Sequence, residues 1–481
     1  MRQRFDWHGI IFVLEILLLF ALGGGAMQAG WAFAAAYYAE PGGKPPTLAT
    51  PIAATSSLAI LAFSTSTPVR IINALSIEEV VPATGKFVAA DLHAMQISLF
   101  RDGALVETIP IKTKGKPGTP WETPSGLYTI QTKEESHFSS IGKVYMPYSM
   151  QFYGNYFIHG WTTYPDGTPT PETFSGGCIK LETEEAAKVF AFADIGTKLF
   201  VYDPPTVDAI APLALATLPP PRVGARAYLV ADIDTGDVYA ERAADAVRPI
   251  ASVTKLMTAL VANETISFDK KIRVPEGALT NPRDPTNTRT RQFVVGDLLY
   301  PLLMQSSNHV ADALAEYYGE GAFVSWMNDA AHALDMASTT FADPSGLSEQ
   351  NVATAEDLFR LSRYLEQKKS FIWRITSEKN RSIIAHDGSR YLVQNVNAPA
   401  DVAPFIGGKI GYTDEAKETI VSVMRLDEEG LERRIAIIVL GSDDQAEDTA
   451  RLARWLSTSA AKASQSACAS CALGSGYRRI P

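Results

Sequence analysis

Residues 249–260 of this 481-residue chain read PIASVTKLMTAL. Apolar residues from Leu256 onward recur with the spacing of one helix face, and Ser252 stands where the helix is expected to begin. A helix places residues at i and i+3 on the same face, so the hydroxyl of Ser252 and the amine of Lys255 lie one turn apart. A lysine that is desolvated or close to a second cation can be neutral near pH 7 and deprotonate a serine. The stretch therefore indicates a serine–lysine active site at the start of a helix.

Two further motifs follow, and they matter because a Ser-x-x-Lys match alone is weak and occurs elsewhere in the chain. Ser306-Ser307-Asn308 lies between two helical patterns. Lys409-Ile410-Gly411-Tyr412-Thr413 leads into a strand-like stretch over residues 419–426. A second strand over residues 435–441 and a helix over residues 446–456 complete the region.

In this order the three motifs resemble the D-alanyl-D-alanine carboxypeptidases of the low-molecular-mass penicillin-binding type, over residues 222–457. The resemblance implies an α/β (α+β) domain of the serine β-lactamase and penicillin-binding kind. Its partners would be peptidoglycan stem peptides, with β-lactams as covalent inhibitors. By the same resemblance Ser252 is the acylated nucleophile and Lys255 its general base. Ser306 would relay a proton, and Asn308 would orient Lys255 and the substrate amide.

The resemblance also assigns the substrate-binding side of this site. Lys409 would attract the terminal carboxylate, and the backbone N–H groups of Ser252 and Tyr412 would bind the oxyanion beside Gly411. The family has threonine where Ile410 stands, and isoleucine cannot hydrogen-bond to that carboxylate. We therefore expect weak binding of free C-termini and of β-lactams. D,D-endopeptidase action on cross-bridges and β-lactamase activity are the alternative specificities.

The preceding region, residues 86–203, is mostly strand-like, with one helical pattern over residues 183–193. Cys178 is the only cysteine within either folded region, and two glycines precede it. Glycines let the backbone approach a substrate and leave N–H groups for an oxyanion. His159 ends an apolar strand, where an imidazole can lower the pKa of a thiol. This pattern indicates a cysteine nucleophile, and an inert buried thiol is the alternative.

The motifs of this region occur in a fixed order: Gly115-Lys116-Pro117-Gly118, Thr123-Pro124-Ser125-Gly126, Met146-Pro147-Tyr148, Ile158-His159-Gly160 and Ser175-Gly176-Gly177-Cys178-Ile179. Together they resemble the L,D-transpeptidase catalytic domain of the YkuD type. The resemblance implies a β-rich sandwich with Cys178 as nucleophile and His159 as its base. The N–H groups of Gly177 and Cys178 would bind the oxyanion. The family has histidine where Gly176 stands. In the substrate site it has arginine where Lys180 stands, and a lysine cannot reproduce the bidentate fork of an arginine.

The remaining segments have simpler compositions. Two arginines precede an apolar run from Ile10 to Met27 that only Glu15 interrupts. This pattern is typical of an export signal and is also near the minimum length of a membrane anchor. The segments expected around the two domains are a signal peptide or signal anchor helix (1–39), a spacer (40–85), a Pro-rich linker (204–221) and a disordered tail (458–481). Export to the cell envelope is expected, with membrane attachment if the signal is retained.

Charge and composition exclude other classes of function. The 43 basic and 53 acidic residues give a net charge of −10, which argues against a nucleic-acid-binding protein. Three cysteines cannot form a disulfide scaffold, and the histidines show no metal-ligand spacing, so no metal and no cofactor are expected. The sequence thus predicts a multidomain, bifunctional peptidoglycan-remodelling enzyme. The alternative from another class is a peptidoglycan-binding scaffold with reduced catalysis.

Overall fold

The computed structural model describes residues 65–66, 70–72, 74–172, 176–203, 212–280, 289–397, 404–428 and 431–474. All of them belong to one compact unit, Ala62–Pro481. The signal or anchor helix expected over residues 1–39 lies outside the described residues. Among the helices that the structure describes, none is long and apolar enough to span a bilayer.

The cysteine-containing domain consists of two sheets that share one apolar core. The strand orders are β5-β4-β3-β11-β6 and β10-β9-β8-β7. Val88 and Leu99 of the first sheet and Met150 and Ile158 of the second are buried in one cluster. The elements are β3 (Lys86–Asp91), β4 (Gln96–Arg101), β5 (Ala104–Pro110), β6 (Gly126–Thr129), β7 (Thr132–Ser139), β8 (Val144–Tyr153), β9 (Tyr156–His159), β10 (Ile179–Lys180), α3 (Thr183–Phe192) and β11 (Lys198–Tyr202).

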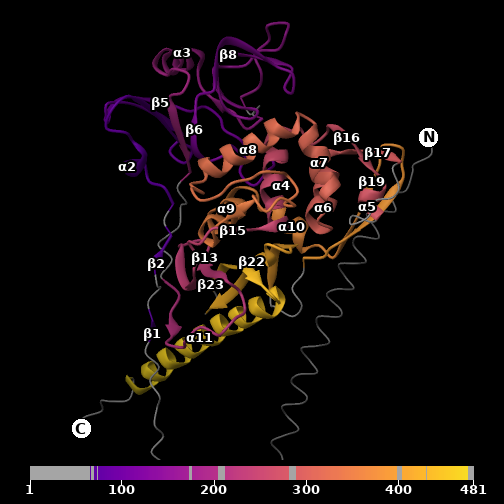
Figure 1. Ribbon diagram of the computed structural model, residues 1–481. Helices are drawn as coiled ribbons and strands as arrows, with labels where there is room; N and C mark the ends of the chain where they lie inside the picture. The colour runs from indigo at the N-terminus through magenta and orange to yellow at the C-terminus, as the bar shows by residue number, and fades with distance from the viewer. Residues whose placement is uncertain are drawn as a thin grey trace, which may run out of the picture. The chain divides into compact units, whose positions relative to one another are not determined.

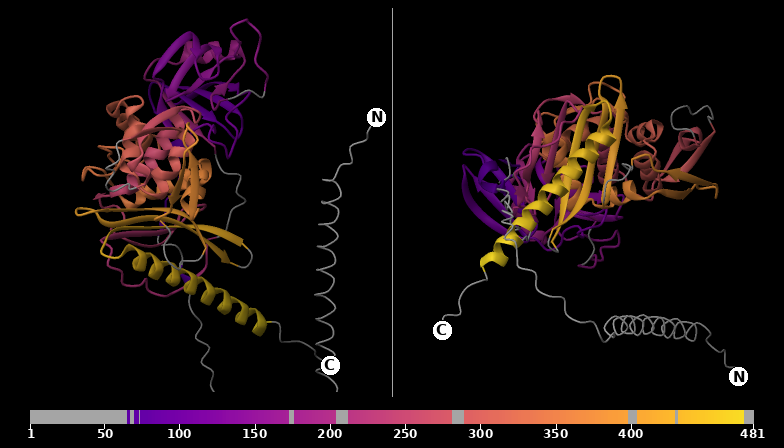
Figure 2. Two further views of the ribbon diagram at one scale, coloured as in Figure 1. Left: turned by 90° about the vertical axis from the view of Figure 1, so that its right-hand side faces the viewer. Right: turned by 90° about the horizontal axis from the view of Figure 1, so that it is seen from below.

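The second domain is built on a six-stranded sheet with the order β2-β14-β13-β23-β22-β21. One face of this sheet packs against α11 (Gln445–Gly474), whose Leu452 and Leu456 share a cluster with Val230 and Ile437 of the sheet (Figure 2). The other helices gather on the opposite face (Figure 1). The strands are β2 (Arg70–Ile71), β13 (Ala227–Asp232), β14 (Asp237–Arg242), β21 (Phe405–Thr413), β22 (Lys417–Glu428) and β23 (Leu431–Ser442).

The helical layer of this domain surrounds the serine–lysine motif. Its helices are η1 (Ala251–Thr254), α4 (Lys255–Thr265), α5 (Gly277–Thr280), α6 (Val295–Met304), α7 (Asn308–Glu316), α8 (Glu320–Ala333), α9 (Ala355–Lys368) and α10 (Phe371–Ser377). Small antiparallel pairs complete the fold: β1 (Thr65–Ser66) with β12 (Leu215–Ala216), β15 (Arg248–Pro249) with β18 (Val352–Ala353), β16 (Lys271–Pro275) with β17 (Thr290–Val294), and β19 (Asn380–Ile384) with β20 (Arg390–Gln394).

Helix α4 is the central element, because all of its residues are buried, polar ones included. A buried polar side chain is tolerated only where it is hydrogen-bonded. Thr258 donates to the carbonyl oxygen of Pro344 (2.6 Å), and Tyr364 donates to the carboxylate of Glu264 (2.9 Å). The neighbours of α4 are thus fixed by polar contacts as well as by apolar packing.

Three segments that the sequence indicated as spacer, linker and tail are partly ordered. In the Pro-rich segment 204–221, residues 215–216 form a strand paired with β1, and Leu213 is buried against the sheet and α11. Over residues 213–216 this segment is therefore held against the domain and is not a free linker, because Leu213 and Leu215 pack on an apolar surface. Helix α11 continues to Gly474, past the point where disorder was expected, and Ala460 and Ala463 on it are buried.

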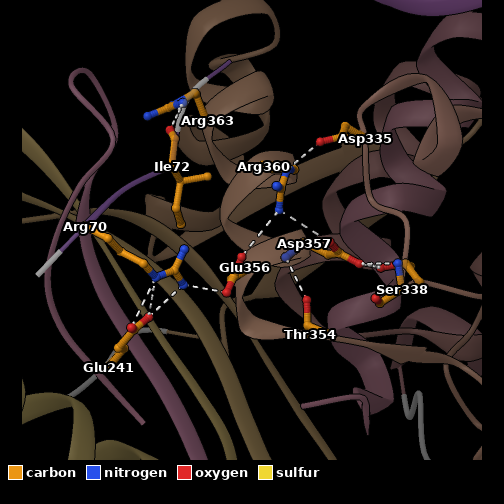
Figure 3. A network of polar contacts seen from close by, with 11 residues as sticks. Arg70, Ile72, Glu241, Asp335, Ser338, Thr354, Glu356, Asp357, Arg360 and Arg363 are labelled. Atoms are coloured by element: carbon orange, nitrogen blue, oxygen red, sulfur yellow. Dashed lines mark hydrogen bonds and ion pairs between the residues drawn. The ribbon is translucent and has the colours of Figure 1, made fainter. Parts of the chain in front are cut away.

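The spacer before the first domain contributes an edge strand to the sheet of the second. Arg70 and Ile71 pair with β14, and Arg363 of α9 donates to the carbonyl oxygen of Ile72 (2.8 Å). The guanidinium of Arg70 lies between two carboxylates, 2.7 Å from Glu241 and 2.5 Å from Glu356 (Figure 3). We call residues 70–72 the strap, because they bind the segment before the first domain to the second domain.

The strap is expected to contribute measurably to stability. Arg70→Met leaves the half-buried carboxylate of Glu241 without its partner and leaves Glu356 only Arg360, at 3.9 Å. We therefore expect the free energy of unfolding in urea to fall by about 1–2 kcal/mol, between the values for exposed and buried pairs. Arg381→Met serves as the control, since Arg381 pairs with Glu378 at 3.7 Å on the surface. Equal effects of the two substitutions would contradict this role of the strap.

Candidate active sites

The serine–lysine site is assembled from three elements of the second domain. Lys255, at the start of α4, is fully buried. Its Nζ lies 3.0 Å from Oγ of Ser252 and 2.7 Å from Oδ1 of Asn308, and it also contacts the carbonyl oxygen of Ser345. The structure therefore brings together three of the residues that the motifs indicated, although Asn308 lies on a different helix.

Burial lowers the pKa of Lys255 to about 7, although the carboxylates of Asp343 and Asp312 oppose this shift. A neutral amine has two N–H groups and one lone pair. If the carbonyl oxygens of Asn308 and Ser345 accept the two N–H groups, the lone pair remains for the hydroxyl of Ser252. The arrangement can take a proton from Ser252 near neutral pH.

Lys409, on β21, is also fully buried. Its Nζ donates to Oγ of Ser306 (3.0 Å), to Oδ1 of Asn397 (3.2 Å) and to the carbonyl oxygen of Ile410 (2.8 Å). Burial and the nearby charge of Lys255 hold the pKa of Lys409 well below its usual range. Ser306 itself has a φ of 58°, a left-handed conformation that is uncommon for serine and typical of functional turns.

The backbone of β21, an edge strand, passes close to Ser252. A Cβ atom on Gly411 would lie 2.8 Å from the backbone nitrogen of Ser252 and 2.7 Å from Oγ1 of Thr419, so only glycine fits there. Tyr412 follows with its side chain exposed and its hydroxyl donating to Asp414 (3.0 Å). An edge strand at this distance leaves N–H groups beside the serine.

Ile410 lies on the other face of this strand. Its register partner Ile420 belongs to the cluster beneath α11, and Ile410 packs against the same cluster. Alternate residues of a strand point to opposite faces, so Lys409 faces the site and Ile410 faces α11. The departure from the family motif thus adds apolar contact behind the sheet.

Two residues to which the sequence assigned no role hold the site together. The carboxylate of Asp343 accepts hydrogen bonds from the backbone of Ser345 and Ser348 and from the side chain of Asn351, each at 2.7 Å. This fixes the carbonyl oxygen of Ser345 against Lys255. Asn397 accepts from Lys409 and donates to Leu303, and no local sequence pattern marks it. Asp343 belongs to the stretch Asp343-Pro344-Ser345-Gly346-Leu347, which also supports the resemblance to the carboxypeptidases.

In the other domain, Cys178 and His159 line one cavity of about 270 Å³. Cys178 directly precedes β10, and His159 ends β9, which pairs in parallel with β10. Nδ1 of His159 lies 2.6 Å from the carbonyl oxygen of Gly160, so this nitrogen carries the proton. Nε2 is then left as the acceptor. The thiol of Cys178 contacts the carbonyl oxygen of Asn155 (3.7 Å).

The electrostatics of this pair differ from the sequence expectation that the imidazole lowers the pKa of the thiol. Burial raises the pKa of Cys178 to about 11 and lowers the pKa of His159 to about 4. Near neutral pH the site therefore holds a thiol and a neutral imidazole, and not a thiolate–imidazolium pair. Such an imidazole can still accept the proton as the sulfur attacks.

The residues around Cys178 are tightly placed on one side and open on the other. Gly177 has a φ of 101°, and a Cβ atom there would lie 2.5 Å from the ring of Tyr156. At Gly176 a Cβ atom would meet no atom of the described residues within 4 Å, so these residues leave room where the family has histidine. The buried Nζ of Lys180 donates to the carbonyl oxygen of Glu172 (3.2 Å) and lies 4.6 Å from the ring centroid of Trp161.

Comparisons with known proteins agree with both resemblances. The family model of D-alanyl-D-alanine carboxypeptidases, peptidase S11, matches residues 215–444, and the model of the L,D-transpeptidase catalytic domain, YkuD, matches residues 85–201. The resemblances inferred from the motifs are thereby confirmed.

Individual relatives match the second domain. A D-alanyl-D-alanine endopeptidase of Pseudomonas aeruginosa is 32% identical over 266 residues, which cover 51% of this chain and 84% of that protein. One of Escherichia coli is 29% identical over 258 residues, covering 51% and 81%. A solved D-alanyl-D-alanine carboxypeptidase of Mycobacterium tuberculosis is 28% identical, covers 50% of this chain and 92% of its own, and has a TM-score of 0.44.

The thiol of Cys178 is expected to react like an unactivated, buried thiol. Only the thiolate is alkylated, so its rate with iodoacetamide should rise about tenfold per pH unit between pH 7 and pH 10 without a plateau. Mass spectrometry of the tryptic peptide that carries Cys178 measures this rate, and Cys178→Ser gives the blank. A plateau below pH 8 would mean that a thiolate–imidazolium pair exists.

Proposed function

Because the chain belongs to the D-alanyl-D-alanine carboxypeptidase family of peptidase S11 and also carries an L,D-transpeptidase (YkuD) catalytic domain, we propose that it remodels peptidoglycan at two active sites. The serine site hydrolyses D,D-peptide bonds of stem peptides. The cysteine site forms L,D-cross-links from tetrapeptide stems. The contact between the buried amine of Lys255 and the hydroxyl of Ser252 carries the first assignment.

At the serine site, Lys255 takes the proton of Ser252 while Oγ attacks the carbonyl carbon of the fourth-position D-Ala. The backbone N–H groups of Ser252 and Tyr412 stabilise the oxyanion. Asn308 holds Lys255. Ser306, which Lys409 contacts, relays the proton that Lys255 took from Ser252 to the leaving amine. Water then hydrolyses the acyl-enzyme. β-Lactams would acylate the same hydroxyl.

Two D,D-peptidase specificities are compatible with this chemistry. A carboxypeptidase removes the last D-Ala of a pentapeptide, whereas an endopeptidase cuts the bond from D-Ala to the amine of a second stem. The names of the two curated relatives described above favour the endopeptidase. Both reactions leave a stem that ends in the fourth-position D-Ala.

At the cysteine site, Cys178 attacks the carbonyl carbon of the diamino acid that precedes this D-Ala. Nε2 of His159 takes the thiol proton and passes it to the nitrogen of D-Ala, which leaves as the amine. The resulting thioester is attacked by the amine of a second stem, which restores the thiol and forms the cross-link. The backbone of Gly177 and Cys178 and the buried Lys180 support substrate binding beside the thiol.

The two reactions then form a relay in the cell envelope, because the product of the serine site is the acyl donor of the cysteine site. Hydrogen bonds between the two domains support the relay, such as the one from Nζ of Lys369 to the carbonyl oxygen of Glu122 (3.0 Å).

Acylation of Ser252 by penicillin is expected to depend on the free amine of Lys255. Burial lowers the pKa of Lys255 to about 7. Below that pH the amine is protonated and cannot accept the serine proton, so the acylation rate should fall about tenfold per pH unit. Mass spectrometry of the acyl-enzyme in samples quenched at set times measures the rate, with Ser252→Ala as the blank. An acylation rate that stays the same from pH 5 to pH 8 would contradict the role of Lys255 as the base.

The relay is tested with defined stems and the full-length protein. Pentapeptide, or a D,D-cross-linked dimer, should be converted to tetrapeptide and then to L,D-cross-linked product. Ser252→Ala should stop both steps, and added tetrapeptide should restore cross-linking alone. Cys178→Ser should stop cross-linking only. Release of D-Ala or dimer cleavage by the Ser252→Ala variant would contradict the proposal, and turnover of nitrocefin would indicate a β-lactamase instead.

A further inference from the structure

The cavity that contains Cys178 has walls from both domains. Together with Cys178 and His159 it is lined by Asn263, Glu264 and Ile266, at the C-terminal end of α4. The N-terminal end of the same helix carries Lys255 of the serine site. One helix of the second domain therefore reaches both reactive centres.

Direct hydrogen bonds fix this end of α4 against the first domain. Nδ2 of Asn263 donates to the carbonyl oxygen of Pro120 (3.2 Å), and Nδ2 of Asn155 donates to the carbonyl oxygen of Thr265 (2.5 Å). The fully buried Nζ of Lys369 donates to the carbonyl oxygen of Glu122 (3.0 Å) and to that of Pro120 (3.2 Å). These hydrogen bonds hold the wall against the first domain beside the cavity.

Within this wall, the side-chain oxygen Oδ1 of Asn263 is an unused hydrogen-bond acceptor. The residue is 2% exposed, and its Oδ1 has no hydrogen-bond partner among the described residues. Its neighbour Glu264 is different, because its carboxylate accepts from Tyr364 (2.9 Å) and pairs with Lys369 (3.6 Å). Buried carbonyl groups in native proteins are nearly always paired. This oxygen is covered from solvent in the structure, but its residue lines the cavity, so a turn of the side chain would present the acceptor to a ligand that donates a hydrogen bond.

We propose that the C-terminal end of α4 is a substrate-binding wall of the cysteine site, where Oδ1 of Asn263 accepts a hydrogen bond from an N–H group of a stem peptide. The inference rests on the proposed L,D-transpeptidase function and adds a specificity residue from the other domain. A stem peptide offers two such donors, the backbone amide of the acyl donor and the ammonium group of the acceptor. Ile266 gives the same wall an apolar surface.

Binding is measured by calorimetry on full-length protein with Cys178→Ala, so that no turnover occurs. The probes are a synthetic tetrapeptide stem, as donor, and a tripeptide stem that ends in the diamino acid, as acceptor. Loss of one neutral hydrogen bond should raise Kd about three- to tenfold in Asn263→Ala. A change for both stems, or for the tetrapeptide alone, assigns the backbone amide. A change for the tripeptide alone assigns the ammonium group.

Two further variants separate this role from a structural one. Asn263→Asp keeps an oxygen acceptor but loses the donor to Pro120, so it should lose less affinity than Asn263→Ala. Ser267→Ala is the matched control, because Oγ of Ser267 pairs with Asp269 and does not line the cavity. Acylation of Ser252 by penicillin reports that α4 is intact in each variant. Equal losses in Asn263→Asp and Asn263→Ala would show that only the domain contact matters and would overturn the inference.

A second measurement needs no substitution at Asn263. A tetrapeptide that carries a diazirine should label the tryptic fragment of residues 256–270, and excess unlabelled tetrapeptide should remove the label. Bound tetrapeptide without label on that fragment, or unchanged Kd in Asn263→Ala, overturns this inference alone. Failure of the Cys178→Ala protein to bind any stem overturns the proposed transpeptidase function, and this inference with it.

Discussion

A lysine amine buried at the start of a buried helix is the constraint on which the second domain depends. A charged ammonium cannot remain in such a place without strong compensation, so the amine becomes neutral and its hydrogen bonds must be supplied. Two acceptors meet this amine: Asn308, which lies on α7, and the carbonyl oxygen of Ser345, which lies in a turn that hydrogen bonds to Asp343 hold in place. The helices and the turn are arranged around one nitrogen atom, and the sheet places β21 against the adjacent serine.

The same helix explains why the two domains form one body. Its C-terminal polar residues are as deeply buried as Lys255, and each must find a partner or a substrate. Some of these partners lie in the first domain, in the loop of residues 120–122. Lys369 also donates hydrogen bonds to carbonyl oxygens of this loop. Apolar residues of both domains accordingly belong to one continuous core.

Much of this arrangement could be predicted from the sequence, since local patterns are sufficient for the placement of Ser252 and Lys255 on one helix turn. The order of motifs indicated both domains, and the glycines before Cys178 indicated a tight backbone approach. Features that depend on tertiary packing could not be predicted. Asn397 and Asn263 have no local signal, because their partners are distant in sequence. Burial dominates the pKa of Cys178, and no pattern of neighbours reveals burial. Prolines in the segment before the second domain suggested an exposed linker, yet its leucines found an apolar face.

The strap has a consequence for the order in which the chain acquires its structure. Arg70 and Glu241 are 171 positions apart, and the whole first domain lies between them. A ribosome delivers β2 well before β14, so this strand must wait unpaired while the first domain is synthesised and can already fold. Closing so long a loop adds little entropic cost beyond that of a shorter one, but such non-local contacts form slowly. The strap is thus synthesised before the first domain and reaches its final place only after that domain and β14 have been synthesised.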